Sequence, residues 1–369
     1  MTTLKAPFPW FGGKSRAALL VWSALGRVDN YVEPFFGSGA VLLARPRETW
    51  RTPEDPGTET VNDASRFLAN FWRAVAHAPD DVAAGCDWPV NETDLHARHK
   101  WLVKRLPDLA ALLDGDPDAF DAKVAAWWCW GQCAWIGSGW CDETRAEVGI
   151  AQVPHLGNAG MGVHRKLPHV GNAGMGVHRK LPHVGDAGRG VHRAPRLPVQ
   201  LPHVGGNHDA GRGVHESARH GHLSDYFAAL SARLRRVRVA CGDWSRVTGD
   251  SVTWRHGTTG VFLDPPYAEG AQQYAAGGTG TSLSADVRAW AIEAGKRRDM
   301  RVVLAGLDGE HDMPREWRAV EWKATGGYGN QRKDGVNENA ARERLWLSPF
   351  CVEQPPRQPS LFDLGGGAK

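Results

Sequence analysis

The stretch YVEPFFGSGAVLLA, residues 31–44, decides the fold class that we expect for this chain. Its first three residues form an apolar, strand-like run that leads into a glycine turn, and residues 40–44 have the composition of a helix. A second short strand at 59–61 ends at Asn62-Asp63, and residues 65–75 show helical apolar spacing. Strand, glycine turn, helix, strand, acid and helix in this order predict a nucleotide-binding half of an α/β sheet.

Three further strand-like runs lie in the C-terminal part of the chain, at residues 236–240, 260–263 and 301–305. Between the last two, residues 284–297 have helical character, and Ser284 is the expected N-cap. These segments supply the remaining half of the same sheet. The length of 369 residues suits one large α/β domain with an insertion, or two domains.

The middle of the chain, residues 66–150, looks mainly helical and is very rich in tryptophan. We expect most of these rings to lie in the core: Trp127, Trp128, Trp130, Trp135 and Trp140. The same segment contains Cys129, Cys133 and Cys141, whose spacing fits no common zinc pattern. The six cysteines show no paired framework of the secreted kind, so we expect reduced thiols and no metal.

A repeat of fourteen residues begins at Pro154 and recurs at Pro168 and Pro182, with a degenerate copy at Pro202. Its density of glycine and proline argues against a helix. The basic pairs in the repeats could contact phosphates, or the repeats could be a duplicated surface loop. Zinc binding by their histidines is a weaker hypothesis, because tandem repeats supply histidine regularly without bringing the rings together.

The overall composition is that of an ordinary globular protein, with 42% hydrophobic and 23% charged residues. No apolar run reaches the roughly 18 to 20 residues that span a bilayer, and the N-terminus lacks the features of a secretory signal. We therefore expect a soluble protein in the cytoplasm. The net charge of +3 permits a polyanionic partner without requiring one.

The tetrapeptide Asp264-Pro265-Pro266-Tyr267 directly follows a predicted buried strand. In an open α/β sheet this position is the carboxyl edge, where ligands bind. The Asp264 carboxylate and the Pro265 carbonyl could accept both hydrogens of an exocyclic amine and free its lone pair to attack a methyl sulfonium. Tyr267 offers a ring on which an extruded base can stack. The alternative is an ordinary strand-ending turn, because aspartate and proline favour turns in any protein.

Two other groups of residues point to the same edge. Gly37 and Gly39 allow backbone to approach a ligand at the start of a helix, while Glu33 and Asp63 place carboxylates at neighbouring strand ends, where ribose hydroxyls could be held. The turn lacks the third glycine of the dinucleotide fingerprint, which argues against NAD. Residues 9–14, PWFGGK, add an aromatic plane, a turn and a cation.

The ordered set PWFGGK (9–14), EPFFGSG (33–39), Asn62-Asp63 and DPPY (264–267) resembles the Dam-like, D12-class adenine-N6 DNA methyltransferases of phages and bacteria. The resemblance implies an α/β, Rossmann-like, seven-stranded methyltransferase sheet with an inserted, mainly helical and repeat-containing target-recognition region. It implies S-adenosylmethionine as the cosubstrate and no metal. By this resemblance Trp10, Lys14, Asp63 and Asp264 bind the cosubstrate, Phe35, Gly37 and Gly39 line its pocket, and Asp243-Trp244 is similar to the family's Asp-Phe pair beside its adenine.

This resemblance divides the chain into five parts. Residues 1–65 and 223–350 form the two parts of the methyltransferase domain, 66–153 the helical recognition region, 154–222 the repeat insert and 351–369 a flexible tail. The implied function is methyl transfer to N6 of adenine in double-stranded DNA by base flipping. The basic loop at 326–333 could close over the flipped base or form a solvated turn.

Other functions stay open at this point. An acid-Pro-Pro-aromatic tetrapeptide serves any planar amine, so the alternatives are cytosine-N4 methylation in DNA, methylation of an RNA base amine, and an inactive DNA-binding protein with this fold. In the tail, residues Gln358–Phe362 resemble the short peptide by which bacterial replication proteins dock into the sliding clamp. A chance match is the alternative for so short a motif.

Overall fold

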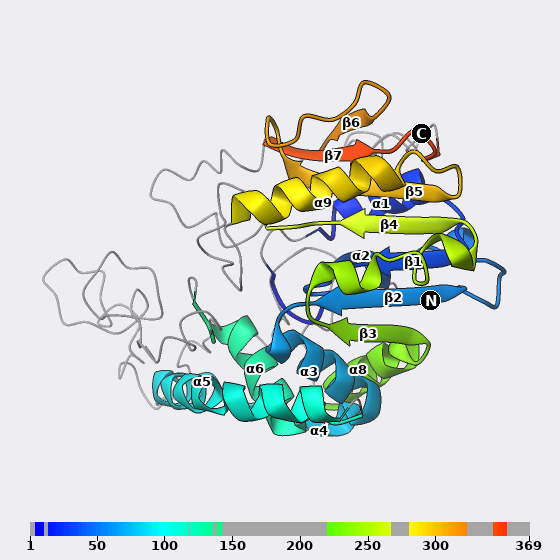
Figure 1. Ribbon diagram of the computed structural model, residues 1–369. Helices are drawn as coiled ribbons and strands as arrows, with labels where there is room; N and C mark the ends of the chain where they lie inside the picture. Colours follow the sequence, from blue (N-terminus) through cyan, green and yellow to red (C-terminus); the bar gives the residue numbers. More distant parts are fainter. Residues whose placement is uncertain are drawn as a thin grey trace, which may run out of the picture.

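A seven-stranded sheet organises the computed structural model, which describes residues 4–10, 14–116, 118–135, 139–141, 220–266, 280–322 and 342–352 (Figure 1). The strand order is β3-β2-β1-β4-β5-β7-β6. Strands β1 to β5 pair in parallel, and β7 runs antiparallel to both β5 and β6. The strands are β1 (Asn30–Glu33), β2 (Thr58–Asp63), β3 (Val237–Cys241), β4 (Thr259–Leu263), β5 (Met300–Leu307), β6 (Arg318–Glu321) and β7 (Glu343–Leu347).

The order of the strands places a topological switch point between β1 and β4. From this point the chain proceeds outward in opposite directions, through β2 and β3 on one side and through β5 on the other. The loops that leave the carboxyl ends of β1 and β4 therefore diverge, and ligands of open α/β sheets bind in the crevice between such loops. Both predicted ligand-binding loops start at this crevice, because the glycine turn follows β1 and Asp264 follows β4.

Helices cover both faces of the sheet (Figure 1). On one face, the helices share a core with Tyr31, Val61 and Phe262. The other face buries Val32, Val261 and Leu263 under α9. The first face carries α1 (Ala17–Leu25), α2 (Ala40–Leu43), α3 (Arg66–His77) and α8 (His220–Leu234), and the 3-10 turn η1 (Arg47–Thr49) follows α2. The second face carries α9 (Gly280–Ala294) with the 3-10 turns η4 (Trp244–Val247) and η5 (Trp254–His256). Helices α4 (Pro79–Cys86), α5 (Glu92–Gly115) and α6 (Ala122–Ala134) extend the layer beyond β3.

The predicted elements are confirmed with one correction. All five predicted strands and the helices at 40–44 and 65–75 are present, and Ser65 caps α3 by accepting a hydrogen bond from the Leu68 amide. Ser284 was expected to cap its helix, and this expectation is wrong. Ser284 lies within α9 and not at its start. Its side chain is buried, and its hydroxyl donates to Oε1 of Glu310 at 2.9 Å. The local sequence pattern had placed this hydroxyl at a helix end, but in the structure it bonds to a side chain that is distant in the sequence.

The described part of the central segment is helical, and its tryptophans form core as predicted. Trp128, Trp130, Trp135 and Trp140 are buried, and Trp127 is half-buried. The Trp140 ring lies directly on Gly131 of α6, where an added Cβ would be only 1.8 Å from the ring. Its indole N–H donates to the Trp128 carbonyl at 3.0 Å. The repeats at 154–219, the loop at 326–333 and the tail segment at 358–362 lie outside the described residues.

His99 of α5 connects its helix to the residues that follow α6. Its ring stacks on Trp135, and its Nδ1 accepts the backbone N–H of Cys141 at 3.3 Å. Burial lowers the pKa of His99 to about 4, so the ring is neutral at pH 7 and Nδ1 is available as an acceptor.

We expect acid to destabilise the protein through His99. A base whose pKa is lowered by folding contributes its full stability above the unfolded value near 6.5 and loses it as the pH falls toward the folded value of about 4. The shift corresponds to a few kcal/mol, in order of magnitude. Urea unfolding of the wild type and of His99→Asn at pH 7 and pH 4.5 measures this: the variant should lose less stability on acidification. His256→Asn, at a half-buried site, should follow the wild type.

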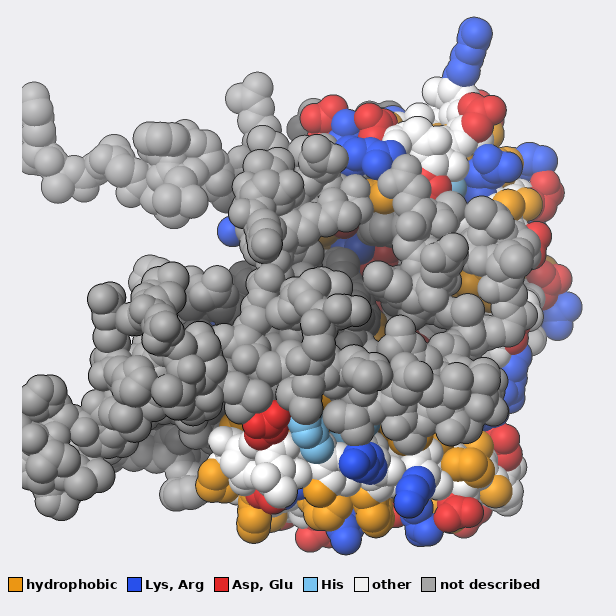
Figure 2. All heavy atoms as spheres, turned by 90° about the vertical axis from the view of Figure 1, so that its left-hand side faces the viewer, with side chains coloured by type: hydrophobic (Ala, Val, Ile, Leu, Met, Phe, Trp, Pro, Cys, Tyr) orange, Lys and Arg blue, Asp and Glu red, His pale blue; other side chains and the backbone are white. Residues whose placement is uncertain are grey.

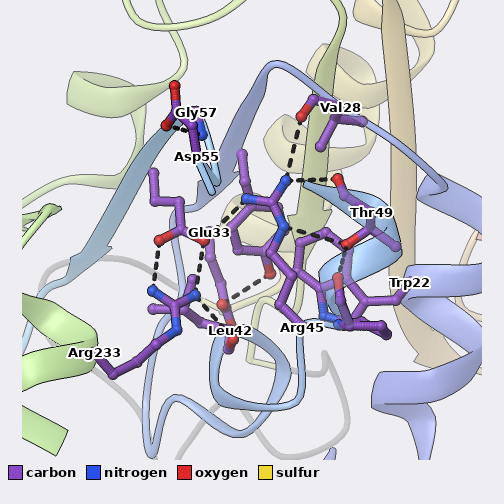
Figure 3. Close-up of polar contacts among 12 residues, drawn as sticks. Trp22, Val28, Glu33, Leu42, Arg45, Thr49, Asp55, Gly57 and Arg233 are labelled. Atoms are coloured by element: carbon purple, nitrogen blue, oxygen red, sulfur yellow. Dashed lines mark hydrogen bonds and ion pairs between the residues drawn. The ribbon is translucent and has the colours of Figure 1, made fainter. Parts of the chain in front are cut away.

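A buried ion network joins the helical layer to the sheet (Figure 3). Arg45, which follows α2, donates to Oε1 of Glu59 in β2 at 2.9 Å and to the carbonyls of Val28 and Thr49. Arg233 of α8 approaches the same carboxylate and donates to both of its oxygens, at 2.6 and 2.7 Å. Two guanidinium groups therefore share one fully buried carboxylate.

Replacing Arg233 with Met is expected to lower the free energy of unfolding by about 2 kcal/mol, because it removes a bidentate hydrogen-bond donor from a buried carboxylate. Glu59 keeps Arg45, which limits the loss. Lys296→Met is the matched control, since Lys296 forms an exposed ion pair with Glu293 that should contribute less than about 0.5 kcal/mol. Denaturant unfolding compares the two variants, and equal losses would contradict the assigned role of the buried network.

Candidate active site

The glycine turn after β1 is held against Trp10. Gly37 and Gly39 have φ angles of 49° and 71°, in the left-handed region that favours glycine. Gly39 also caps the first turn of α2. A Cβ on Gly37 would lie 2.5 Å from the indole of Trp10, so the ring rests on the turn itself. Trp10 and Gly37, both predicted to meet the cosubstrate, are therefore neighbours.

Asp63 holds the glycine turn from the other side. It ends β2, and its two carboxylate oxygens accept the amides of Gly37 at 2.9 Å and Ser65 at 3.0 Å. Burial raises the pKa of Asp63, and the backbone N–H donors oppose this rise. Because a carboxylate oxygen can accept more than one hydrogen bond, Asp63 can brace the turn and still accept from a hydroxyl.

Lys14 and Asp264 are brought together across the switch point. The Lys14 ammonium lies 3.0 Å from Oδ1 of Asp264, and the lysine side chain is only 5% exposed. A second carboxylate, Glu343 of β7, lies 3.9 Å from the same nitrogen, and the Trp322 ring centroid is 5.6 Å away. Sequence reasoning missed Glu343, because it opens a strand that carries no motif. Pro265 is buried and Pro266 half-buried, and Tyr267 lies outside the described residues.

An aromatic pair flanks the carboxyl ends of β1 and β3. Phe35 stacks on Trp244, with ring centroids 6.4 Å apart and planes inclined by 25°, and Trp244 meets Trp290 of α9 edge to face. Asp243 precedes Trp244, is exposed, and caps η4 by accepting the Ser245 amide at 2.9 Å. Such a pair of rings beside an exposed carboxylate suits a planar heterocycle with donor groups.

Glu33 is buried at the end of β1. Its side chain is 2% exposed and accepts the hydroxyl of Tyr31, its neighbour on the same face of β1, at 2.8 Å. Burial raises the pKa of Glu33 well above its usual value, the Tyr31 hydrogen bond opposes this, and the charge of Asp264 adds to it. A role of Glu33 in holding a ribose hydroxyl stays a prediction.

Glu33→Gln tests separately how this carboxyl group affects stability and whether it binds the ribose of the cosubstrate. An acid whose pKa is raised by folding contributes stability below its unfolded value near 4.5, and this contribution is lost as the pH rises. The glutamine variant should therefore gain melting temperature relative to the wild type between pH 5 and pH 8. Thermal melts measure this change, and a variant that loses more stability at pH 8 than at pH 5 contradicts it. A loss of cosubstrate affinity in calorimetry would support the predicted ribose contact.

The face toward which β2, β3 and β4 point is seen in Figure 2. Among its described side chains, Lys and Arg are interspersed with Asp and Glu, and hydrophobic side chains gather over the helical layer. Within the described ranges, no group of three or more His, Cys, Asp or Glu side chains is arranged to hold a metal. No described helix is long and apolar enough to cross a membrane.

The comparisons with known proteins agree with this arrangement. Residues 10–103 match the family model of D12 class N6 adenine-specific DNA methyltransferase. The matched segment contains Trp10, the glycine turn and Asp63, which contact one another, and Lys14, which pairs with Asp264. No curated protein is similar enough to match the sequence. Over residues 10–103, the chain is therefore similar to the D12-class enzymes that methylate adenine N6 in DNA, and the matched segment lies on a sheet with a switch point at its carboxyl edge.

Proposed function

We propose that the enzyme transfers a methyl group from S-adenosylmethionine to N6 of a flipped adenine in duplex DNA, with Asp264, Pro265, Pro266 and Tyr267 as its catalytic residues. The observation that carries this proposal is the position of Asp264, at the carboxyl end of β4 and in an ion pair with Lys14, across the switch point from the glycine turn.

The residues at the switch point fit S-adenosylmethionine. Gly37 and Gly39 keep side chains out of the turn, so backbone is open to close approach beside Trp10. Asp63 and Asp243 offer carboxylate oxygens at the ends of β2 and β3, where hydroxyls and an adenine can be held. Phe35 and Trp244 supply ring faces for the adenine. The cosubstrate supplies a methyl group activated by its bond to a positively charged sulfur.

The residues of the tetrapeptide act on the target amine. The Asp264 carboxylate and the Pro265 carbonyl accept its two hydrogens, which reduces conjugation of the nitrogen with the ring and exposes its lone pair. The prolines keep the backbone fixed and remove competing N–H donors. As the N6–carbon bond forms, the carbon–sulfur bond breaks with its electron pair passing to sulfur, and N6 then releases one proton to water. Tyr267 stacks on the flipped base in this proposal.

The proposal is tested with purified full-length protein, S-adenosylmethionine labelled in the methyl group, and a mixed-sequence DNA duplex. We expect label in N6-methyladenine after nucleoside digestion. Label in cytosine would support N4 methylation, and label only in an added structured RNA would support an RNA base amine as the substrate. Binding of the cosubstrate without transfer to any nucleic acid would support an inactive DNA-binding protein.

Two further proposals concern partners. The basic pairs in the repeats add sequence-independent contacts to DNA phosphates, and Gln358–Phe362 docks into the sliding clamp. Deletion of residues 358–362 should abolish capture of the purified clamp on beads while methylation of free DNA stays unchanged. Undiminished capture by the shortened protein would exclude the clamp motif.

A further inference from the structure

Lys14 lies between two carboxylates that come from different strands. Asp264 follows β4, and Glu343 opens β7, with β5 between these strands in the sheet. The Glu343 and Lys14 side chains are 6% and 5% exposed, whereas that of Asp264 is 18% exposed. One ammonium therefore serves two carboxylates, of which the one nearer to it is also the one more open to solvent.

The unequal distances have a chemical consequence. At 3.0 Å, Lys14 binds directly to Oδ1 of Asp264, so this oxygen is partly occupied as an acceptor. At 3.9 Å, Glu343 is at the limit of an ion pair with the same nitrogen. Because an ammonium carries three N–H donors on a flexible stem, a small shift moves Lys14 toward Glu343 without leaving its charge buried and unpaired.

Glu343 is therefore placed to act on Asp264 through Lys14. When Asp264 accepts an additional hydrogen bond, its hold on Lys14 weakens. A buried ammonium that is released from one carboxylate is stabilised by a second carboxylate beside it, because pairing lowers the cost of burying a charge. With Glu343 in place, the ammonium keeps an anionic partner throughout. The Trp322 ring, 5.6 Å from Nζ, adds an aromatic contact on the same cation.

We propose that Glu343 is a positioning residue for methyl transfer, which takes over the charge of Lys14 while Asp264 accepts the amine of the target base. This inference rests on the proposed function, in which Asp264 receives the amine hydrogens. In the resting protein Asp264 already satisfies Lys14, so loss of the Glu343 charge should slow the transfer step and leave cosubstrate affinity almost unchanged.

The test compares Glu343→Gln, which removes the charge at nearly constant size, with Glu343→Asp, which keeps it. Glu321→Gln is the control, because Glu321 on β6 is 81% exposed and pairs with Arg344. Single-turnover methylation of duplex DNA gives the transfer rate, and calorimetry gives the Kd for S-adenosylmethionine. We expect Glu343→Gln to lower the rate at least about tenfold and to change the Kd less than about threefold. Glu343→Asp and Glu321→Gln should stay within about threefold of the wild-type rate.

Several results would overturn the inference. They are a wild-type rate in Glu343→Gln, equal losses in the Gln and Asp variants, and a loss confined to the Kd. Thermal melts establish that each variant is folded at the assay temperature. If Glu343→Gln does not fold, Glu343→Asp decides: a rate near that of the wild type supports the inference, and a loss above about tenfold contradicts it. A wild-type enzyme that leaves adenine unmodified contradicts the proposed function instead, before any variant is compared.

Discussion

Asp264→Asn is expected to lower the rate of methyl transfer to DNA by at least about a thousandfold, equivalent to about 4 kcal/mol of transition-state stabilisation. The substitution keeps the size of the side chain but replaces one acceptor oxygen with an N–H donor and removes the charge. The amide N–H cannot accept a hydrogen bond from the target amine or from the Lys14 ammonium, which lies 3.0 Å from the native carboxylate. Glu343 still faces Lys14, so the lysine keeps one anionic partner.

The transfer of labelled methyl groups to duplex DNA, at saturating cosubstrate, measures this loss. Asp308→Asn is the matched control, because Asp308 follows the neighbouring strand β5, and its side chain is 59% exposed and pairs with Arg344. We expect the control to transfer at nearly the wild-type rate. An Asp264→Asn enzyme within about tenfold of the wild type would show that the carboxylate is not essential to the transfer step.

Gly37→Ala is expected to weaken binding of S-adenosylmethionine by at least about a hundredfold, or about 3 kcal/mol. Two costs combine at this position. The φ angle of 49° is strained for any residue with a Cβ, and the added methyl would lie 2.5 Å from the Trp10 indole. The turn and the ring must therefore move apart, which displaces two elements predicted to hold the cosubstrate.

Calorimetric titration with S-adenosylmethionine measures the effect, and two variants interpret it. Gly249→Ala is the control, since its added Cβ meets no atom within 4 Å, and its affinity should equal that of the wild type. The double variant Trp10→Ala/Gly37→Ala removes the steric contact but retains the backbone strain. If it binds as Trp10→Ala alone does, the indole contact accounts for the loss. Unchanged affinity in Gly37→Ala would argue against this turn as the cosubstrate site.

Much of the fold could be predicted because local signals and tertiary position agree. The runs at 31–33, 59–61 and 260–263 are short, apolar and bounded by turn residues, which is typical of buried parallel strands. Gly37 and Gly39 predicted a turn whose backbone can approach a ligand, and both have the positive φ that other residues adopt only with strain. Parallel strands share a carboxyl edge, so the residues that follow them could be assigned to one site before their distances were known.

The sequence alone could not predict which side chains turn toward that edge. Tyr31 and Glu33 lie on one face of β1 by the alternation of the strand, but a strand buried on both faces carries no pattern that says which face holds the ligand. The structure turns Glu33 into the core, toward the Tyr31 hydroxyl. Ser284 likewise has the residue type of a helix cap and was placed inside α9, where Glu310 accepts its hydroxyl.

The sequence by itself therefore determined strands β1 to β5, the glycine turn, the carboxylate that ends β2 and the one that follows β4, because backbone conformation and local burial depend on near neighbours in the chain. Only the tertiary structure decided that Lys14 bridges Asp264 and Glu343. Lys14 lies 250 positions from Asp264 and 329 positions from Glu343 in the sequence, and the bridge depends on β7 returning antiparallel beside β5, an arrangement set by the packing of the whole sheet.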